Sequence, residues 1–204
     1  MIFQPTILIL AALQLVSSFP VENSKTHQPR APEHFAHPGV LLDTAQLNLI
    51  KYKVAQGAQP WSNAYSAMLA DPLASLSRTP SPTTIVQCGP TSTPNIGCTS
   101  ERQDALAAYA MSLAWYISDS TKYAQKAISY MNAWAQTIQG HNNSNAPLQT
   151  GWSGASWARA AEIIRYSNAG WAASDIATFE NMLRNVYLPE VIVGSNSNGN
   201  WELG

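Results

Sequence analysis

Charged side chains are scarce in this chain. Asp, Glu, Lys and Arg make up 11% of its 204 residues, against roughly 25% in an average domain. The formal net charge is −1, so the chain lacks the surplus of Lys and Arg that characterises nucleic-acid-binding proteins. We therefore expect no nucleic-acid partner. The length fits a single domain with enough chain to bury a core.

Motifs for metal-dependent or nucleophilic chemistry are also lacking. The four histidines, His27, His34, His37 and His141, are scattered, and no two of them lie four residues apart as in a helical zinc site. The chain has no Gly-x-Ser-x-Gly nucleophile elbow. No glycine-rich loop follows a strand in the way that phosphate binding requires. The sequence thus predicts no metal site and no cofactor.

Cysteine is limited to Cys88 and Cys98, which enclose a loop rich in Gly and Pro. In an oxidising compartment two such residues most simply pair, and we predict a disulfide between them. A metal site is not predicted here, because no His or further Cys lies nearby at ligand spacing. Asn142 begins an Asn-x-Ser sequon in a stretch expected to be a polar loop, which makes it a candidate glycosylation site.

Long apolar runs are absent apart from one near the amino terminus. Residues 7–16 form an apolar segment too short to span a bilayer but of the length found in signal peptides. Small residues at positions 17 and 18 place the cleavage before Phe19. We therefore expect a signal peptide over residues 1–18, an extended proline-rich lead-in over 19–38, and a secreted protein with no membrane contact after processing.

Helical signals dominate the rest of the chain, and no alternating strand pattern is found. Gly and Pro are frequent over 72–100, so a long loop that carries the disulfide is expected there. A capping-box pattern, Ser then Gln three residues later, places the start of one helix at Ser100. The predicted helices cover 45–56 with a cap at Asp43 or Thr44, 60–72, a helix from Ser100, 120–140, 155–168 and 174–192.

Successive helix pairs of this kind predict an all-α domain over residues 39–204. Small residues within the helices would allow their axes to approach closely; they are Ala107, Ala108, Ala110, Ala158, Ala160 and Ala161. The loops are uneven in length, and some contain aromatic residues. This favours an α/α toroid over a simple bundle, because the loops of a toroid line a cleft at one end.

Seven tryptophans are the strongest compositional signal. Trp115 and Trp134 fall within predicted helices and are expected in the core. Aromatic rings at the rim of a cleft can stack on sugar rings, while Asn, Gln and Ser bind the hydroxyl groups. Core packing is the commoner role for any one tryptophan, but a set at loop or helix edges indicates a carbohydrate cleft: Trp61, Trp152, Trp171 and Trp201.

Several segments together carry a family resemblance. They are HPGVLLDTAQLNLIK, PWSNAYSAM, ERQDALAAYAMSLAWYISDSTKYAQKAISYMNAWAQTI, LQTGWSGASWARAAEIIRYS and SNGNWELG. In this order and spacing they resemble the N-terminal half of fungal alginate-lyase-like proteins, which belong to the α/α-toroid group of alginate and chondroitin AC lyases. The resemblance runs from about His37 to the end of the sequence.

The resemblance implies β-elimination on a uronic-acid polysaccharide. In this chemistry a neutral amide binds the uronate carboxyl group and stabilises the charge that develops when the C5 proton leaves. The resemblance places that amide at Asn198 or Asn200, with Asn196 less favoured, and it assigns Trp201 a stacking or packing role. Gln149 and Trp152 are weaker candidates for the substrate groove. Glu162 and Arg165 are expected to form a structural ion pair.

In the family, the Tyr and Arg of the active site lie far downstream of the asparagine loop. In this sequence the corresponding positions would fall beyond Gly204. We therefore expect a C-terminally truncated, incomplete toroid whose base and acid are missing and whose activity is incomplete. We expect a monomer that binds an acidic polysaccharide. Two alternatives stay open, a non-catalytic secreted carbohydrate-binding domain and an α/α-barrel glycoside hydrolase. A hydrolase needs two facing carboxylates, for which the candidates are Asp104, Glu162, Glu180 and Glu202.

Overall fold

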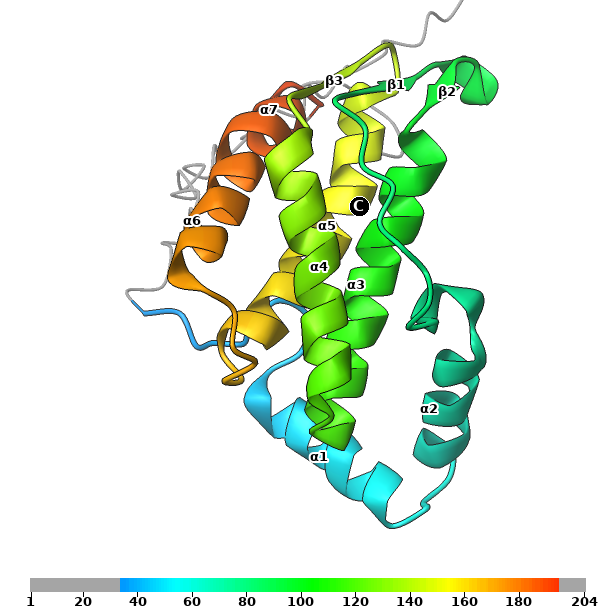
Figure 1. Ribbon diagram of the computed structural model, residues 1–204, viewed down its shortest axis with the longest axis vertical. Coiled ribbons are helices and arrows are strands. Elements are labelled where there is room, and N and C mark those ends of the chain that lie inside the picture. The colour runs from blue at the N-terminus through cyan, green and yellow to red at the C-terminus, as the bar shows by residue number, and fades with distance from the viewer. Residues whose placement is uncertain (1–33, 195–204) are drawn as a thin grey trace, which may run out of the picture. The chain divides into compact units, whose positions relative to one another are not determined.

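The computed structural model describes residues 34–194, in which helices predominate (Figure 1). The α-helices are α1 (Thr44–Ala55), α2 (Trp61–Ala70), α3 (Cys98–Ser118), α4 (Thr121–Thr137), α5 (Ala146–Arg165), α6 (Ala173–Met182) and α7 (Leu188–Gly194). Two short 3₁₀ turns, η1 (Pro72–Ala74) and η2 (Pro90–Ser92), and one π-helical turn, η3 (Leu183–Tyr187), complete the helical elements.

Three short strands form a small sheet in the order β2-β1-β3, which the sequence did not predict. Strand β1 (Ile85–Cys88) pairs antiparallel with β2 (Asn95–Ile96) and parallel with β3 (Gly140–Asn142). Residues 72–100 are therefore not a plain loop. The sheet lies across one end of the helices, where Figure 1 shows β1 and β3 above the ends of α3, α4 and α5.

Helix α3 lies at the centre of the described fold and packs most extensively on α5 and α4. Four alanines of α3 are fully buried, as are alanines of α4 and α5, so the helix axes approach closely; they are Ala105, Ala107, Ala108, Ala114, Ala124, Ala127 and Ala160. Ala110, Ala158 and Ala161 are only partly buried. Larger rings fill the space beside this contact, with Trp134 6.2 Å from Trp157 between ring centroids. The helical expectation is confirmed, while the toroid stays a prediction.

The first two helices form where the sequence predicts them. Asp43 caps α1 by accepting a hydrogen bond from the Gln46 backbone N–H at 2.7 Å, and the Gln46 side chain accepts one from the Asp43 N–H at 3.0 Å. Helix α2 begins at Trp61, directly after Pro60. The first residues of both helices are set by neighbouring residues in the sequence, which explains why these helix starts could be predicted from sequence.

Two helix starts differ from the prediction. Helix α3 begins at Cys98 after Gly97, which has a φ of 77° and acts as the N-cap, so the predicted Ser100 capping box is wrong. Helix α5 begins at Ala146, with Pro147 in its first turn, instead of at residue 155. The stretch that contains Gln149 and Trp152 is therefore helix and not loop.

The predicted ion pair between Glu162 and Arg165 is also wrong. Glu162 accepts hydrogen bonds from His37 Nδ1 at 2.9 Å and from the Gly39 N–H at 3.0 Å, while Arg165 pairs with Glu180 of α6. Partners from distant segments replace the partner on the same helix. Glu162 thereby ties the segment before α1 to α5.

The predicted disulfide is confirmed. Cys88 at the end of β1 is bonded to Cys98 at the start of α3, with the two Cα atoms 5.8 Å apart. Both cysteines are buried. The bond therefore joins the sheet to the central helix beside the pocket described below.

Replacing both cysteines with serine is expected to lower the free energy of unfolding by about 2–3 kcal/mol, because the unfolded chain regains the freedom of a short closed loop. Urea denaturation followed by circular dichroism measures this difference. Reductant should destabilise the wild-type protein by a similar amount and leave the double variant unchanged. Equal stability of the two proteins would contradict the prediction.

None of the helices between residues 34 and 194 is long and apolar enough to cross a membrane. Within the same residues, no group of three His, Cys, Asp or Glu side chains is arranged to hold a metal ion.

Candidate functional site

A pocket of about 160 Å³ opens at one end of the helices, the end at which the sheet lies. The loop closed by the disulfide forms one wall, and the first turns of α3 and α5 form the other. Its polar and aromatic lining differs from the apolar core below it. The lining residues that carry chemistry are Asn95, Arg102, Asn145, Gln149 and Trp152.

Arg102 and Trp152 meet at this pocket. The guanidinium carbon of Arg102 lies 5.7 Å from the centre of the Trp152 ring, within the range of a cation–π contact. Trp152 is 49% exposed, so one part of its ring is free to contact a ligand. No carboxylate among residues 34–194 pairs with Arg102. A planar cation beside an exposed aromatic ring suits a ligand that combines a carboxylate with an apolar face.

Gln149 binds Arg102 through a side-chain hydrogen bond. Its Oε1 accepts a hydrogen bond from Arg102 Nη1 at 2.8 Å, and its Nε2 donates to the Cys98 carbonyl oxygen at 3.0 Å and to Glu101 Oε2 at 2.5 Å. The side chain is only 1% exposed. Gln149 therefore lines the pocket with its polar groups already occupied by protein partners.

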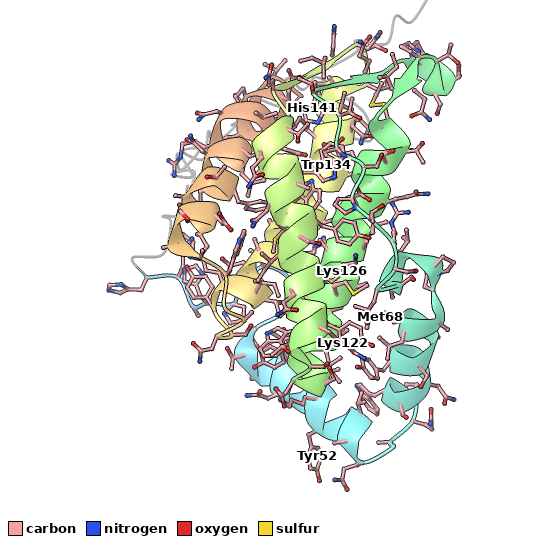
Figure 2. All side chains as sticks on the ribbon, in the orientation of Figure 1. Tyr52, Met68, Lys122, Lys126, Trp134 and His141 are labelled. Carbon is pink, nitrogen blue, oxygen red and sulfur yellow. A yellow bond between two sulfur atoms is a disulfide. The ribbon has the colours of Figure 1, made fainter. Side chains whose placement is uncertain are left out.

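A buried polar cluster continues from Gln149 into the protein. Glu101 is fully buried, and its Oε1 accepts hydrogen bonds from His141 Nε2 at 2.8 Å and from the Tyr187 hydroxyl at 2.5 Å. Tyr187 in turn accepts one from Trp157 Nε1 at 3.0 Å. The His141 side chain is also fully buried, and Figure 2 shows this residue at the sheet end of α4. Its Nδ1 atom has no hydrogen-bond partner.

Sequence reasoning missed most of this cluster. His141 was expected in a loop without a role, Arg102 and Glu101 were noted only as part of a helix start, and Tyr187 was not singled out. A usable signal was present, because Glu101 and Arg102 place two opposite charges side by side within four residues of Cys98, in a chain that has few charges. Their partners, however, come from segments 40 or more residues away.

Comparison with known sequences decides the family. The sequence model of the family described as alginate lyase matches residues 54–189, which is about two thirds of the chain. The chain belongs to the alginate lyase family. Its pocket and its buried cluster both lie within the matched residues. Neither a curated protein nor a solved structure matches the chain.

Membership of the alginate lyase family points to a polysaccharide lyase. The three residues on which the resemblance places the most chemistry, Asn198, Asn200 and Trp201, lie outside the described residues, as does Asn196. Gln149 and Trp152, by contrast, are brought together at the pocket. Their role as substrate-binding residues stays a prediction.

The other tryptophans predicted at a cleft rim have different environments. Trp171 is buried, and its indole N–H donates to Asn132 Oδ1 at 2.9 Å, so it belongs to the core of this alginate lyase domain. Trp61 is partly buried at the start of α2, with Lys53 Nζ 5.4 Å from its ring centre. Trp134 is buried as predicted. Only Trp152 of the predicted rim residues described by the structure lies at the pocket.

The predicted glycosylation site falls at the end of a strand. Asn142 is the last residue of β3 and is exposed, although the sequence predicted a loop. Exposure is what a sequon needs in order to be modified. Glycosylation of Asn142 stays a prediction.

The three described carboxylates that a hydrolase could use are engaged elsewhere. Asp104 is fully buried and accepts hydrogen bonds from Arg78, Ser81 and Trp134. Glu162 binds His37, and Glu180 binds Arg165. None of the three lines the pocket.

Tyr187 is held in its protonated form. Burial raises its pKa well above the usual 10.0, and the neighbouring Glu101 charge and hydrogen bond raise it further. A base that removes a proton near neutral pH needs the opposite shift. The environment of Tyr187 therefore suits a structural donor to Glu101.

This shift predicts a loss of stability in alkali. The unfolded chain releases the Tyr187 proton above about pH 10, whereas the folded protein keeps it, so the free energy of unfolding falls as the pH rises through this range. Tyr187→Phe should make the fall less steep. Urea denaturation at about pH 8 and about pH 11 measures it. Tyr52→Phe is the control, because Tyr52 is 60% exposed and lies on the outer face of α1 (Figure 2); an unchanged slope in Tyr187→Phe would contradict the assignment.

Proposed function

We propose that this protein is a secreted polysaccharide lyase that cleaves a uronic-acid-containing polysaccharide of the alginate or glucuronan type by β-elimination. The observation that carries the proposal is the contact between Arg102 and Trp152 at a pocket within the alginate lyase domain. A uronate residue has both features that this pair suits, a carboxylate and a sugar ring with an apolar face.

The chemical difficulty of the reaction is the weak acidity of the C5 proton beside the carboxyl group. Removing it creates an enolate-like charge, which a neutral amide donor at the carboxyl group stabilises. We assign this role to Asn198 or Asn200 on the basis of the family resemblance. Arg102 and Trp152 bind a uronate unit, and Gln149 orients Arg102. The base and the acid are not assigned to any residue.

One observation favours a second candidate function, a carbohydrate-binding domain without catalysis. Tyr187 and His141 both bind Glu101 in the polar cluster beside the pocket, and both side chains are buried. Neither can reach a substrate proton in this arrangement. The hydrolase alternative has less support, because its described carboxylates serve structural contacts.

Product analysis separates the three functions. The purified protein is incubated with alginate, glucuronan, chondroitin and a neutral glucan, while reducing ends and ultraviolet absorbance are followed together. A lyase produces new ends with the absorbance of an unsaturated uronate, whereas a hydrolase produces new ends without it. Binding of an acidic polymer without new ends identifies the binding domain. The proposal would be refuted if the protein neither bound nor cleaved any of the uronate polymers.

The Arg102→Ala variant tests the pocket in the same assay. It should weaken binding of a uronate oligosaccharide by about 10-fold or more, because a charge-assisted hydrogen bond is lost. Arg165→Ala is the matched control, since Arg165 pairs with Glu180 away from the pocket. Equal affinities of both variants and the wild type would remove Arg102 from the site.

A further inference from the structure

We propose that Glu101 is a positioning residue, whose buried carboxylate fixes the amide of Gln149 and thereby holds the Arg102 guanidinium at the pocket. The functional meaning of this inference rests on the proposed function, whereas the positioning itself is a property of the fold. The observation behind it is a continuous chain of hydrogen bonds from Glu101 through Gln149 to Arg102.

The direction of each hydrogen bond in this chain is fixed. A carboxylate without a proton only accepts, so the Gln149 atom that faces Glu101 must be the donor Nε2. The Cys98 carbonyl oxygen also requires a donor at that position. The other amide atom, Oε1, is therefore the one presented to Arg102, which only donates. Glu101 and the Cys98 carbonyl oxygen together thus fix which side of the amide Arg102 meets.

Glu101 is itself held from several directions. His141 comes from β3 and Tyr187 from η3, so both donors to Oε1 belong to elements other than α3. The carboxylate lies within a helix and is fully buried, which is uncommon for Glu unless its charge is compensated by hydrogen bonds. A residue held this firmly provides a rigid reference for Gln149.

The variant Glu101→Gln replaces one accepting carboxylate oxygen with a donating N–H₂ group and leaves the size of the side chain unchanged. If its Oε1 keeps the bonds from His141 and Tyr187, its amide N–H₂ faces the N–H₂ of Gln149, and two donors oppose each other. Rotating the Gln149 amide moves the same conflict to Arg102. In the first arrangement the Gln149 amide loses the acceptor that fixes it, and in the second Arg102 loses its acceptor, so in both cases the guanidinium is held less firmly.

The first measurement reports on Arg102 directly and needs no substrate. The arginine reagent phenylglyoxal modifies a free guanidinium faster than one that is held, and mass spectrometry of the peptide that contains Arg102 gives its rate. We expect Arg102 to react about 3-fold or more faster in Glu101→Gln than in the wild type, in line with the loss of a charge-assisted hydrogen bond. Circular dichroism confirms that the compared proteins are folded.

Glu180→Gln is the matched control. Glu180 also binds an arginine, Arg165, but lies away from the pocket. This variant should accelerate modification of Arg165 and leave the rate at Arg102 unchanged. Glu101→Asp keeps the charge and withdraws the carboxylate from Gln149, so it provides the same test if Glu101→Gln does not fold; Arg102 should again react faster than in the wild type.

A double-variant cycle tests whether Glu101 acts through Gln149. Gln149→Met removes the amide link, so adding Glu101→Gln to it should accelerate Arg102 modification no further. Additive effects would show that Glu101 acts by another route and would overturn the inference. An unchanged Arg102 rate in a folded Glu101 variant would overturn it as well.

The second measurement is the affinity for a saturated alginate or glucuronan tetrasaccharide. Glu101→Gln should weaken it about 10-fold through the displaced guanidinium, while Glu180→Gln should not change it. The two ideas can fail separately. If Arg102 reacts faster in Glu101→Gln but the wild type binds no uronate, the positioning role stands and the proposed function is refuted. If the wild type binds uronate and Glu101→Gln binds it equally well, with Arg102 unchanged, only the positioning role is refuted.

Discussion

Replacing Asp104 with alanine is expected to lower the free energy of unfolding by about 3–5 kcal/mol, the cost of breaking a buried ion pair by removing one partner. Asp104 is fully buried on α3. It accepts hydrogen bonds from Arg78 Nη2 at 2.6 Å, from the Ser81 N–H at 2.7 Å and from Trp134 Nε1 at 2.8 Å. Alanine would leave all three donors without this acceptor.

Arg78 adds to this cost because its guanidinium loses the carboxylate with which it pairs. It is 26% exposed, and its Nε is buried without a hydrogen-bond partner even in the intact protein. The segment between η1 and β1 is attached to α3 through these contacts, since Arg78 and Ser81 both lie in it. Loss of Asp104 therefore loosens the chain that leads into the sheet.

Urea denaturation followed by circular dichroism measures the effect, with equal slopes as the sign that only stability changed. Lys51→Ala is the control. Lys51 Nζ also lies 2.6 Å from a carboxylate oxygen, that of Asp119, but these side chains are 36% and 69% exposed. Its loss should cost no more than about 1 kcal/mol, because surface ion pairs contribute little. Similar costs for the two variants would contradict the role given to Asp104.

Elements that depend on neighbouring residues could be predicted from the sequence. Asp43 and Gln46 cap α1 within four residues, and the proline at position 60 marks the start of α2. The disulfide could be predicted because only two cysteines are present. Each of these signals lies within a short stretch of chain, so no knowledge of the tertiary structure was needed.

The sheet could not be predicted in this way. Strands β1 and β3 have four and three residues, which is too short for a recognisable alternation. Their parallel pairing joins Val86 to His141 across the whole of α3 and α4. Only the folded arrangement of the helices brings the two strands together.

The first turns of α5 show packing overriding local preference. Gly151 and Gly154 disfavour a helix, yet both lie within α5. At Gly154 a Cβ would lie 3.2 Å from the Tyr187 ring, so a side chain there would require the ring to shift by a few tenths of an ångström. The glycine allows η3 to approach α5, and that approach places Tyr187 beside Glu101.

Two of the residues predicted for the substrate groove lie at the pocket, while their part in binding stays a prediction. Trp152 and Gln149 were selected as groove residues, and both lie at the pocket. The roles differ, because Gln149 is buried against Glu101 and only Trp152 is exposed. Glutamate is rarely fully buried, so a sequence gives no reason to place Glu101 beneath a pocket.

The largest effect on activity is expected at Asn198 and Asn200. In protein that shows lyase activity, alanine at the amide that binds the uronate carboxyl group should lower kcat by about 100- to 1,000-fold, the usual cost of removing one donor from a developing oxyanion. The reason is that the charge appears only as the C5 proton leaves, so the donor stabilises the transition state more than the bound substrate. KM should change much less than kcat.

Asn196→Ala is the matched control, because it removes the same amide from the same polar stretch at the position that the resemblance favours least. It should keep near wild-type kcat. Aspartate at the essential position should be at least as harmful as alanine, since a carboxylate there accepts instead of donating and repels the uronate. Initial rates from the ultraviolet absorbance of the product, with helicity checked by circular dichroism, give the comparison. Wild-type rates in both Asn198→Ala and Asn200→Ala would show that the amide that stabilises the developing charge does not lie in this stretch.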